Sequence, residues 1–419
     1  WSGFKAKEIK EEMAIRAAKM AGMDNDEYEA YLSRGVFFNM TSRTITGLVG
    51  TLFRRAPVIQ NKPKDLDFSE VSKDHESPFM YTKSVTREIV TVGRHGVLLD
   101  RARKGSKKPF MAGYIAENIL DWDYTDIDGF NVLTRVVLRE INIVRSQTTP
   151  SNLPPNATDG REGNDAPPQS FISASDRGSA GQTGAGSRQY YASYRVLQLD
   201  RNEDGSLVYR QYVYKNDAAN ASLDSDEPEI ITPTRFGVPL DFIPFEFFGP
   251  YSNTPGIEKP PVLDIVDLNL SHYKSYTHLE HGRWYTGMPV YYVPVANSEE
   301  VENDYTIGAS TIWETVPGDK PGILEFFGQG LKFLENALDQ KEQQASSLGG
   351  RMLGVRAVAT AESDNQVALN EKNEQSLLLN IANTVDAGMS RLLGWWAWWQ
   401  GEAFETAMKI TVELNKDFL

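Results

Sequence analysis

Three helical apolar seams in the second half of the chain constrain its fold more than any other feature. Apolar side chains recur at three- and four-residue steps over 262–282, 331–350 and 365–400, which is the spacing of one helix face. Between the first two seams, residues 286–330 carry short strand-like runs, Gly and Pro, and an excess of acidic side chains. This order predicts an antiparallel helix pair with a small acidic β-module at its tip, followed by a third helix about 50 Å long.

Two features interrupt the second seam. Lys341 takes one of its seven-residue positions, and Gly349-Gly350 and Gly354 are expected to end the helix. The glycine-bounded stretch beyond carries Arg351 and Arg356. It is either an ordinary interhelical loop or a mobile loop that presents sparse positive charge to a polyanion.

The part of the chain before residue 255 mixes helix and strand patterns, so the fold class is α+β. Helical spacing covers 36–53 and 78–95, and alternating strand patterns cover 114–145 and 191–215. Residues 146–189 differ, because they are rich in Pro, Ser, Gly, Thr and Asn and contain one aromatic residue. Such a composition cannot bury enough surface to order itself, so we expect that a neighbouring subunit would have to hold this insert.

Composition excludes several classes of function. The 419 residues contain no cysteine, which excludes disulfides, thiolate metal sites and cysteine nucleophiles. The net charge of −14 is unlike that of a freely diffusing nucleic-acid binder, which neutralises phosphates with basic side chains. No apolar run approaches the ~18 residues of a membrane span, so no membrane partner is predicted. The first and last residues read as cuts through a longer polypeptide.

The candidate catalytic and metal-binding motifs lack the residue spacing that such sites require. His272, His278 and His281 share one predicted helix but lack the i, i+4 pair of a metalloprotease helix, so we expect polar helix faces at a subunit contact. The acidic stretch 121–129 lacks the ligand spacing of a calcium loop and is expected to be a turn between strands. No metal, cofactor or catalytic residue is predicted, and the chain is not expected to be an enzyme.

A tryptophan cluster ends the third predicted helix. It contains Trp395, Trp396, Trp398 and Trp399, half of the eight tryptophans in the chain. No charged amphipathic face accompanies it, so a membrane-interface helix is disfavoured. We expect the cluster to be buried between a sheet and a neighbouring subunit.

Several runs of sequence together point to one family. They are GVPLDFIPF at 237–245, PPVLDIVDLNLSHY at 260–273 and GMP at 287–289, with shorter runs at 37–39, 47–50, 117–122 and 376–378. In this order the chain resembles the portal proteins of tailed bacteriophages, in a branch whose members are known only as phage proteins of unknown function. The insert at 146–189 departs from the family pattern.

The resemblance implies a portal fold with a helical and β wing, a two-helix stem, a small β-containing clip and a long wing helix. The crown that follows the wing in this family would lie largely beyond Leu419. The implied parts are the wing at 1–255, the first stem helix at 256–284, the clip at 285–330, the second stem helix at 331–350, the tunnel loop at 351–364, and the long wing helix with the start of the C-terminal wing or crown segment at 365–419.

The resemblance also implies a function. A portal is a ring, usually a dodecamer, at one capsid vertex of the virion, and it is assembled in the host cytoplasm. Double-stranded DNA passes through it during genome packaging and ejection. Its partners would be the major capsid protein, the terminase large subunit that packages DNA, the tail adaptor protein and a scaffolding protein.

The resemblance assigns roles to particular residues. Arg351 and Arg356 would face DNA from the tunnel loop, and the four tryptophans would lie at the subunit interface. The clip residues expected to dock the motor or adaptor are Glu299, Glu300, Glu302 and Asp304. Two alternatives stay open: a head–tail adaptor or collar ring protein, and a carboxylate-based hydrolase.

Overall fold

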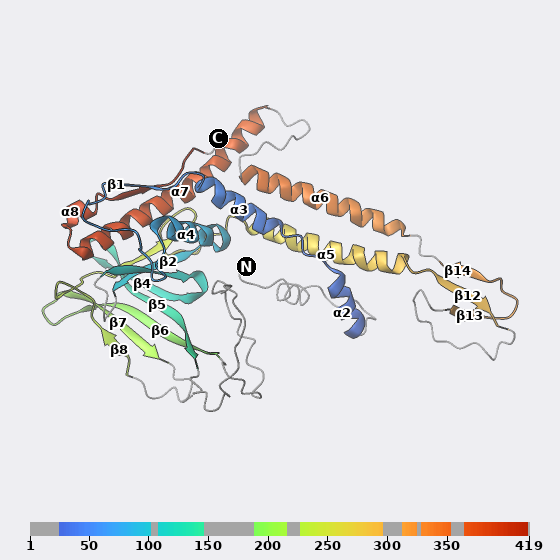
Figure 1. The fold of residues 1–419 in the computed structure, drawn as a ribbon, viewed down its shortest axis with the longest axis horizontal. Coiled ribbons are helices and arrows are strands. Elements are labelled where there is room, and N and C mark those ends of the chain that lie inside the picture. The colour runs from blue at the N-terminus through green and yellow to red at the C-terminus, as the bar shows by residue number, and fades with distance from the viewer. Residues whose placement is uncertain are drawn as a thin grey trace, which may run out of the picture. The chain divides into compact units, whose positions relative to one another are not determined.

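The computed structural model confirms a mixed α+β chain (Figure 1). It divides into two compact units. The first contains Trp1–Thr44 and Val262–Val367, and the second contains Ile45–Pro261 and Ala368–Leu419. Residues 25–44 therefore group with the helix pair and not with the rest of the predicted wing. The structure describes residues 25–101, 108–145, 188–215, 227–295, 312–324, 328–352 and 364–417.

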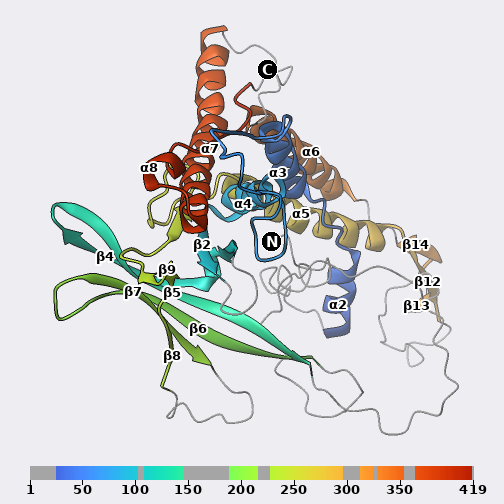
Figure 2. The same cartoon turned by 60° about the vertical axis from the view of Figure 1, so that its left-hand side comes forward.

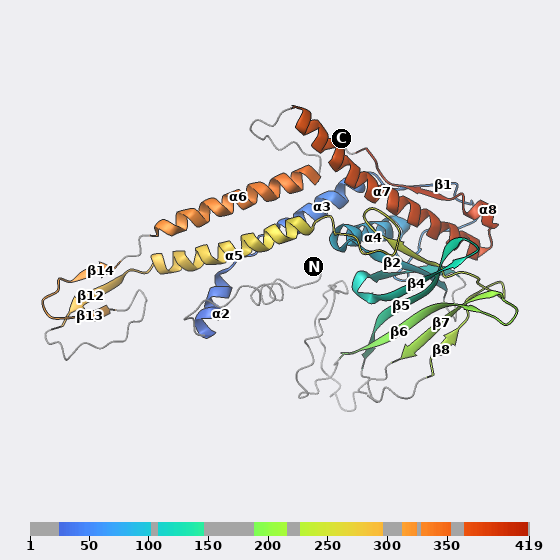
Figure 3. The ribbon, with the colours of Figure 1, turned by 180° about the vertical axis from the view of Figure 1, so that it is seen from behind.

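The first unit is built on two long helices, α5 (Leu263–Thr286) and α6 (Gln329–Met352). They run side by side, as Figures 1 and 3 both show. The chain between them forms β12 (Val290–Pro294), β13 (Ile312–Thr315) and β14 (Gly322–Leu324), in the order β13–β12–β14. Strands β12 and β14 lie within a few residues of the ends of α5 and α6, and β13 pairs with the central strand β12. The small sheet therefore extends the end of the helix pair.

Two N-terminal helices complete the described part of the first unit. They are α2 (Asn25–Arg34) and the start of α3 (Met40–Leu52). Asn269 explains how α3 begins: its Oδ1 accepts from the Thr41 backbone N–H at 3.1 Å, and its Nδ2 donates to the Phe38 carbonyl at 2.8 Å. The amide thus satisfies backbone groups that a helix start leaves open. This is why a polar residue occupies a buried position of the α5 seam.

Two antiparallel sheets form most of the second unit. A meander contains β4 (Ile119–Ile127), β5 (Phe130–Arg145), β6 (Arg188–Arg201), β7 (Leu207–Lys215) and β8 (Glu229–Ile231) in sequence order (Figure 2). A second sheet has the order β11 (Phe245–Phe248), β2 (His95–Arg101), β3 (Pro109–Ile115). The 3-10 helix η1 (Ala116–Asn118) joins the two sheets.

Helices cover the β11–β2–β3 sheet. The central strand β2 is buried from His95 to Leu99 without alternation, as expected where both faces are covered. One of these helices is α4 (Pro78–Val92). The Ser77 side chain caps its N-terminus, and Gly93 in the left-handed conformation ends the helix. Another is the second-unit part of α7 (Asp364–Gln400), which approaches β11 closely because Gly388 leaves room for the Phe248 ring.

Short elements close the second unit around α7. The hairpin of β9 (Thr234–Arg235) and β10 (Val238–Pro239) lies near its C-terminal end, followed by α8 (Phe404–Ala407). Strand β15 (Thr411–Glu413) returns to pair with β1 (Val58–Gln60).

One predicted turn is wrong. Residues 121–127 of the acidic stretch belong to strand β4, and only Asp128 and Gly129 form the turn, both with positive φ. On this strand Asp121 pairs with Arg135 of β5, while Asp126 accepts from the Gly129 N–H in the turn. The acidic side chains are thereby spread along an edge strand instead of being gathered in a loop.

Candidate functional site

Polar contacts fix α5 and α6 in antiparallel register. The Nε2 of His272 lies 3.2 Å from a carboxylate oxygen of Glu342. About three turns further along α5, toward the sheet, Nη2 of Arg283 donates to Glu335 at 2.8 Å. The partner number falls as the α5 number rises, so the helices run in opposite directions, as the sequence predicts.

The seam break at Lys341 has a structural explanation. Its Nζ donates to the Ser271 carbonyl at 3.1 Å and to Oγ of Ser275 at 2.6 Å, so α5 supplies acceptors for the charge. Partial burial lowers the pKa of Lys341. At the sheet end of the pair, Gly282 lets the Leu331 side chain pack against the α5 backbone. The two helices therefore pack through both small residues and specific hydrogen bonds.

The small sheet carries an exposed apolar row. Tyr291 pairs in register with Ile312 on one side and with Ile323 on the other, so the three side chains lie across the sheet on one face. They are 46–63% exposed. A contiguous exposed apolar surface on a small module is typical of a contact with another chain. We call this set the clip row.

Helix α2 contacts α5 through an arginine–histidine contact. Arg34 Nη1 lies 3.1 Å from Nδ1 of His281, and its guanidinium stands 4.2 Å over the Trp284 ring. Since an arginine can only donate, Nδ1 must accept, which requires neutral His281 with its proton on Nε2. Burial lowers the pKa of His281, and the nearby Arg34 charge lowers it further. Glu27, which accepts from the Tyr285 hydroxyl at 2.5 Å, opposes this shift.

This geometry predicts that α2 loosens from α5 in mild acid. The folded state holds the pKa of His281 below its unfolded value near 6.5, so the unfolded state binds more protons in that range. The stabilisation is complete above the unfolded pKa and falls as pH drops through the folded pKa. The protection factors of the amides of 25–34, which are corrected for the intrinsic pH dependence of exchange, should therefore fall below about pH 6.5.

A glutamine variant provides the control for this pH dependence. His281→Gln keeps an acceptor for Arg34 but does not titrate, so the protection factors in α2 should lose most of their acid dependence. The same acid response in His281→Gln and in the wild type would show that another group controls the docking of α2.

The predicted subunit contact is wrong for two of the three histidines. His272 is buried against α6 and His281 against α2, within the chain. His278, whose ring nitrogens lie 3.5 Å from the Tyr31 hydroxyl, also faces α2. The i, i+3 spacing places His278 and His281 on one face, but the sequence does not show that α2 covers it.

The predicted DNA-facing and docking residues fall largely outside the described part of the chain. Helix α6 continues through Gly349 and Gly350 to Met352, so the glycines do not end it and Arg351 belongs to its last turn instead of a loop. At Gly349 a side chain would crowd the Thr44 hydroxyl, so close packing explains this glycine. Arg356 lies outside the described residues, as do the acidic residues predicted to dock the motor or adaptor, Glu299, Glu300, Glu302 and Asp304.

The tryptophan cluster is largely internal to the second unit. Trp396 and Trp399 are 1% and 2% exposed, and their indole N–H groups donate to the carbonyls of Pro109 and Thr234. The prediction of a subunit interface is wrong for these two, because the chain's own sheet and hairpin already cover them. Trp395 and Trp398 are half-buried beside Phe242, and their role at an interface stays a prediction.

A polar cluster between the two sheets escaped the sequence analysis. Arg195 on β6 donates to Glu140 at 2.8 Å and to Gln211 at 2.6 Å, and it lies 3.4 Å from Asp100 on β2. The Tyr114 hydroxyl donates to Glu140 at 2.7 Å. Burial alone would raise the pKa of Glu140, but the hydrogen bonds and charge of Arg195 outweigh it and hold the pKa below its ordinary value. The cluster is thus a satisfied structural network, which alternation in single strands does not reveal.

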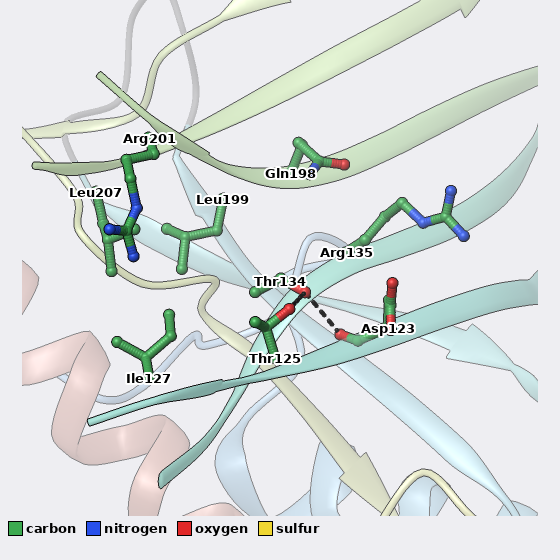
Figure 4. A pocket seen from close by; sticks show the side chains of 9 residues that line it. All are labelled: Asp123, Thr125, Ile127, Thr134, Arg135, Gln198, Leu199, Arg201 and Leu207. Carbon is green, nitrogen blue, oxygen red and sulfur yellow. Dashed lines mark hydrogen bonds between the residues drawn. The ribbon is translucent and has the colours of Figure 1, made fainter. Parts of the chain in front are cut away.

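A shallow hollow lies on the open face of the meander (Figure 4). Thr125 and Thr134 meet there at 3.3 Å, and the Thr134 hydroxyl also donates to the Asp123 carbonyl at 3.2 Å. Hydroxyls bonded in this way form ordinary cross-strand pairs. An activated nucleophile would instead lie beside a general base. The hollow therefore gives no support to the hydrolase alternative.

Comparisons with known proteins match the helix–sheet–helix part of the chain. Residues 261–400 match a family described as "Domain of unknown function (DUF4055)". This range runs from the start of α5 to the end of α7. No curated protein matches the chain.

The described residues hold neither a metal-binding cluster nor a membrane-crossing helix. Among them, no group of three or more His, Cys, Asp or Glu side chains is placed to hold a metal ion. None of their helices combines the length and apolar character that a membrane crossing requires.

Proposed function

We propose that this chain is the subunit of a phage portal, a ring at one capsid vertex through which double-stranded DNA enters and leaves. The observation that carries the proposal is the antiparallel pair α5–α6 with a small three-stranded sheet inserted at one end. In the family that the sequence resembles, this arrangement is the stem and clip. A head–tail adaptor or collar protein lacks a clip between two stem helices, so the geometry favours the portal.

Ring geometry supports a channel of suitable size. Twelve helices spaced about 10 Å apart place their axes on a circle ~38 Å across and leave ~28 Å clear inside, which is wide enough for duplex DNA. The exposed acidic side chains on the helix pair include Asp264, Asp267, Glu335, Asp339 and Glu342. A wall with an acidic excess does not bind phosphates through counterion release, so DNA can slide past it.

Under this proposal the remaining parts take the roles implied by the resemblance. Arg351 at the end of α6 and Arg356 beyond it would make the few attractive DNA contacts. The acidic residues at 299–304 would dock the terminase large subunit or the tail adaptor, where charge controls specificity and association rate. The second unit would form the wing that meets the capsid, and ATP hydrolysis would belong to the motor.

The clip row gives the proposal a direct test. We expect native mass spectrometry and negative-stain microscopy of the full chain to show one closed ring with a central channel. Ile312→Glu with Ile323→Glu should prevent closure, because it places charge in an apolar contact between neighbours. The matched control is Phe130→Glu, which charges an exposed aromatic side chain at the turn between β4 and β5.

A discrete monomer or dimer over a wide concentration range would contradict the portal. A ring that closes equally well in the clip-row double variant and in the control would contradict only the role of the clip row and place the ring contact elsewhere.

A further inference from the structure

An aromatic patch lies at the C-terminal end of α7 in the second unit. Its exposed members are Phe236, Val238 and Phe404, which are 55–70% exposed. Half-buried Phe242, Trp395 and Trp398 connect them: Trp398 contacts Phe242 at a ring separation of 5.8 Å and Phe404 at 6.4 Å. We call these six residues the α7 patch.

The hairpin that presents Phe236 adopts a backbone that a phenylalanine does not favour. Phe236 and Gly237 form its two-residue loop with φ of 52° and 88°. Such a turn prefers Asn-Gly, because asparagine tolerates the left-handed region and a bulky side chain does not. An aromatic residue held there and left exposed does not serve the hairpin itself. Strain of this kind gathers where a side chain is held ready for a contact.

Arg235 holds the patch in place. Its Nε donates to the Trp398 carbonyl at 2.8 Å and its Nη2 to the Glu402 carbonyl at 3.0 Å. These carbonyls lie at the C-terminus of α7, where a positive charge is favourable. The guanidinium also lies 4.6 Å from the Trp398 ring centre and 5.1 Å from that of Phe236. The patch is therefore preorganised, and the Arg235 charge is already engaged by its own chain.

Acidic side chains border the α7 patch. Asp241 adjoins Phe242 and Glu405 adjoins Phe404, and both are exposed, while Glu402 follows the end of α7. An apolar centre with an acidic border complements a segment with an apolar anchor flanked by basic residues. A second copy of this chain is a poorer match, because each copy carries a net charge of −14.

We propose that the α7 patch is a docking site for a partner polypeptide, which inserts an apolar anchor side chain flanked by lysine or arginine. Phe236, Phe404 and Trp398 would surround the anchor, and Asp241, Glu402 and Glu405 would attract the basic flanks. This site shares no residue with the clip row or with the helix pair, so the argument for it does not depend on the proposed ring.

Labelled synthetic peptides test the site in the full-length chain. The probe has a central leucine-proline-leucine flanked on both sides by arginines, and its two controls replace the arginines by glutamates or the central residues by glycines. Fluorescence anisotropy should show binding of the probe only. Phe236→Asn should weaken that binding by at least ~10-fold, as expected at a central apolar contact.

The asparagine variant separates binding from folding. Asn-Gly is the preferred pair for this turn, so Phe236→Asn should keep or raise the melting temperature while the affinity falls. Phe130→Asn, at an exposed aromatic position outside the patch, should leave the affinity unchanged.

Three outcomes would overturn the proposal. The first is equal binding of the probe by the wild type and by Phe236→Asn. The second is equal binding of the arginine and glutamate peptides. The third is self-association that Phe236→Asn abolishes without any specific peptide binding, which would assign the patch to a second copy. None of these outcomes depends on the clip-row test. The docking proposal and the portal proposal can therefore be refuted independently of each other.

Discussion

Arg195→Met is expected to reduce the stability of the second unit by about 3–5 kcal/mol, the cost of leaving buried charges without their partner. Arg195 is largely buried and contacts Glu140, Asp100 and Gln211. Methionine fills a similar volume but donates no hydrogen bond. Two carboxylates would then remain in a poorly solvated space between the sheets, and each would have to stay charged at high cost or bind a proton.

The loss of stability caused by Arg195→Met should depend on pH. In the wild type the pKa of Glu140 lies below its ordinary value, so its contribution is present above the unfolded pKa and is lost as pH falls through the folded pKa. In the variant only the Tyr114 hydrogen bond and the Lys73 charge still oppose the effect of burial, so the pKa of Glu140 rises and protonation relieves the cost. The difference between variant and wild type should therefore shrink in acid.

Native-state hydrogen exchange of amides in β5 and β6, followed across pH, measures this difference. Arg135→Met is the matched control, because Arg135 pairs with Asp121 on the solvent-exposed side of the same sheet. Its loss should cost less than about 1 kcal/mol. Similar costs for the two variants, or a deficit in Arg195→Met that does not change with pH, would contradict the buried-network explanation.

Trp396→Ala is expected to destabilise the second unit by about 3–5 kcal/mol, as for other large aromatic side chains removed from a core. The indole is buried against the Phe68 ring, with ring centres 4.8 Å apart, and its N–H donates to the Pro109 carbonyl at 2.9 Å. The substitution creates a cavity and leaves a buried carbonyl without its donor.

The neighbouring tryptophan supplies the control. Trp398→Ala should cost less, about 2 kcal/mol of stability, because its ring is only partly buried. Hydrogen exchange in β3 and thermal unfolding measure both variants. If Trp398→Ala is as destabilising as Trp396→Ala, the division of the cluster into internal and surface members is wrong.

The sequence predicted helices and strands more reliably than it predicted the tertiary contacts between them. The seams at 262–282 and 365–400 predicted α5 and α7 to within a few residues, because an apolar face at helical spacing depends only on local order along the chain. The same spacing could not show that Asn269 in the seam serves the start of α3, or that Ser275 accepts from Lys341. Both contacts join residues that are distant in sequence.

Glycine and tryptophan positions show where local rules fail. Gly349-Gly350 has low helix propensity and predicted the end of a helix, yet α6 includes both glycines and continues two residues further, to Met352. Four tryptophans in five residues predicted one shared role, but a helix turns by about 100° per residue and directs them to different surroundings. Two of them enter the core and two remain at its edge.

The sequence by itself determined the α+β class, the order of helices and strands, and the absence of cysteine chemistry, because composition and periodicity are properties of single segments. Only the tertiary structure decided which polar groups are satisfied, which aromatic side chains are buried, and that Phe236 is exposed on a strained turn. Those features arise where segments meet that lie far apart along the chain. The free energies of these contacts depend on both segments that meet, so they cannot be inferred from the sequence of either segment alone.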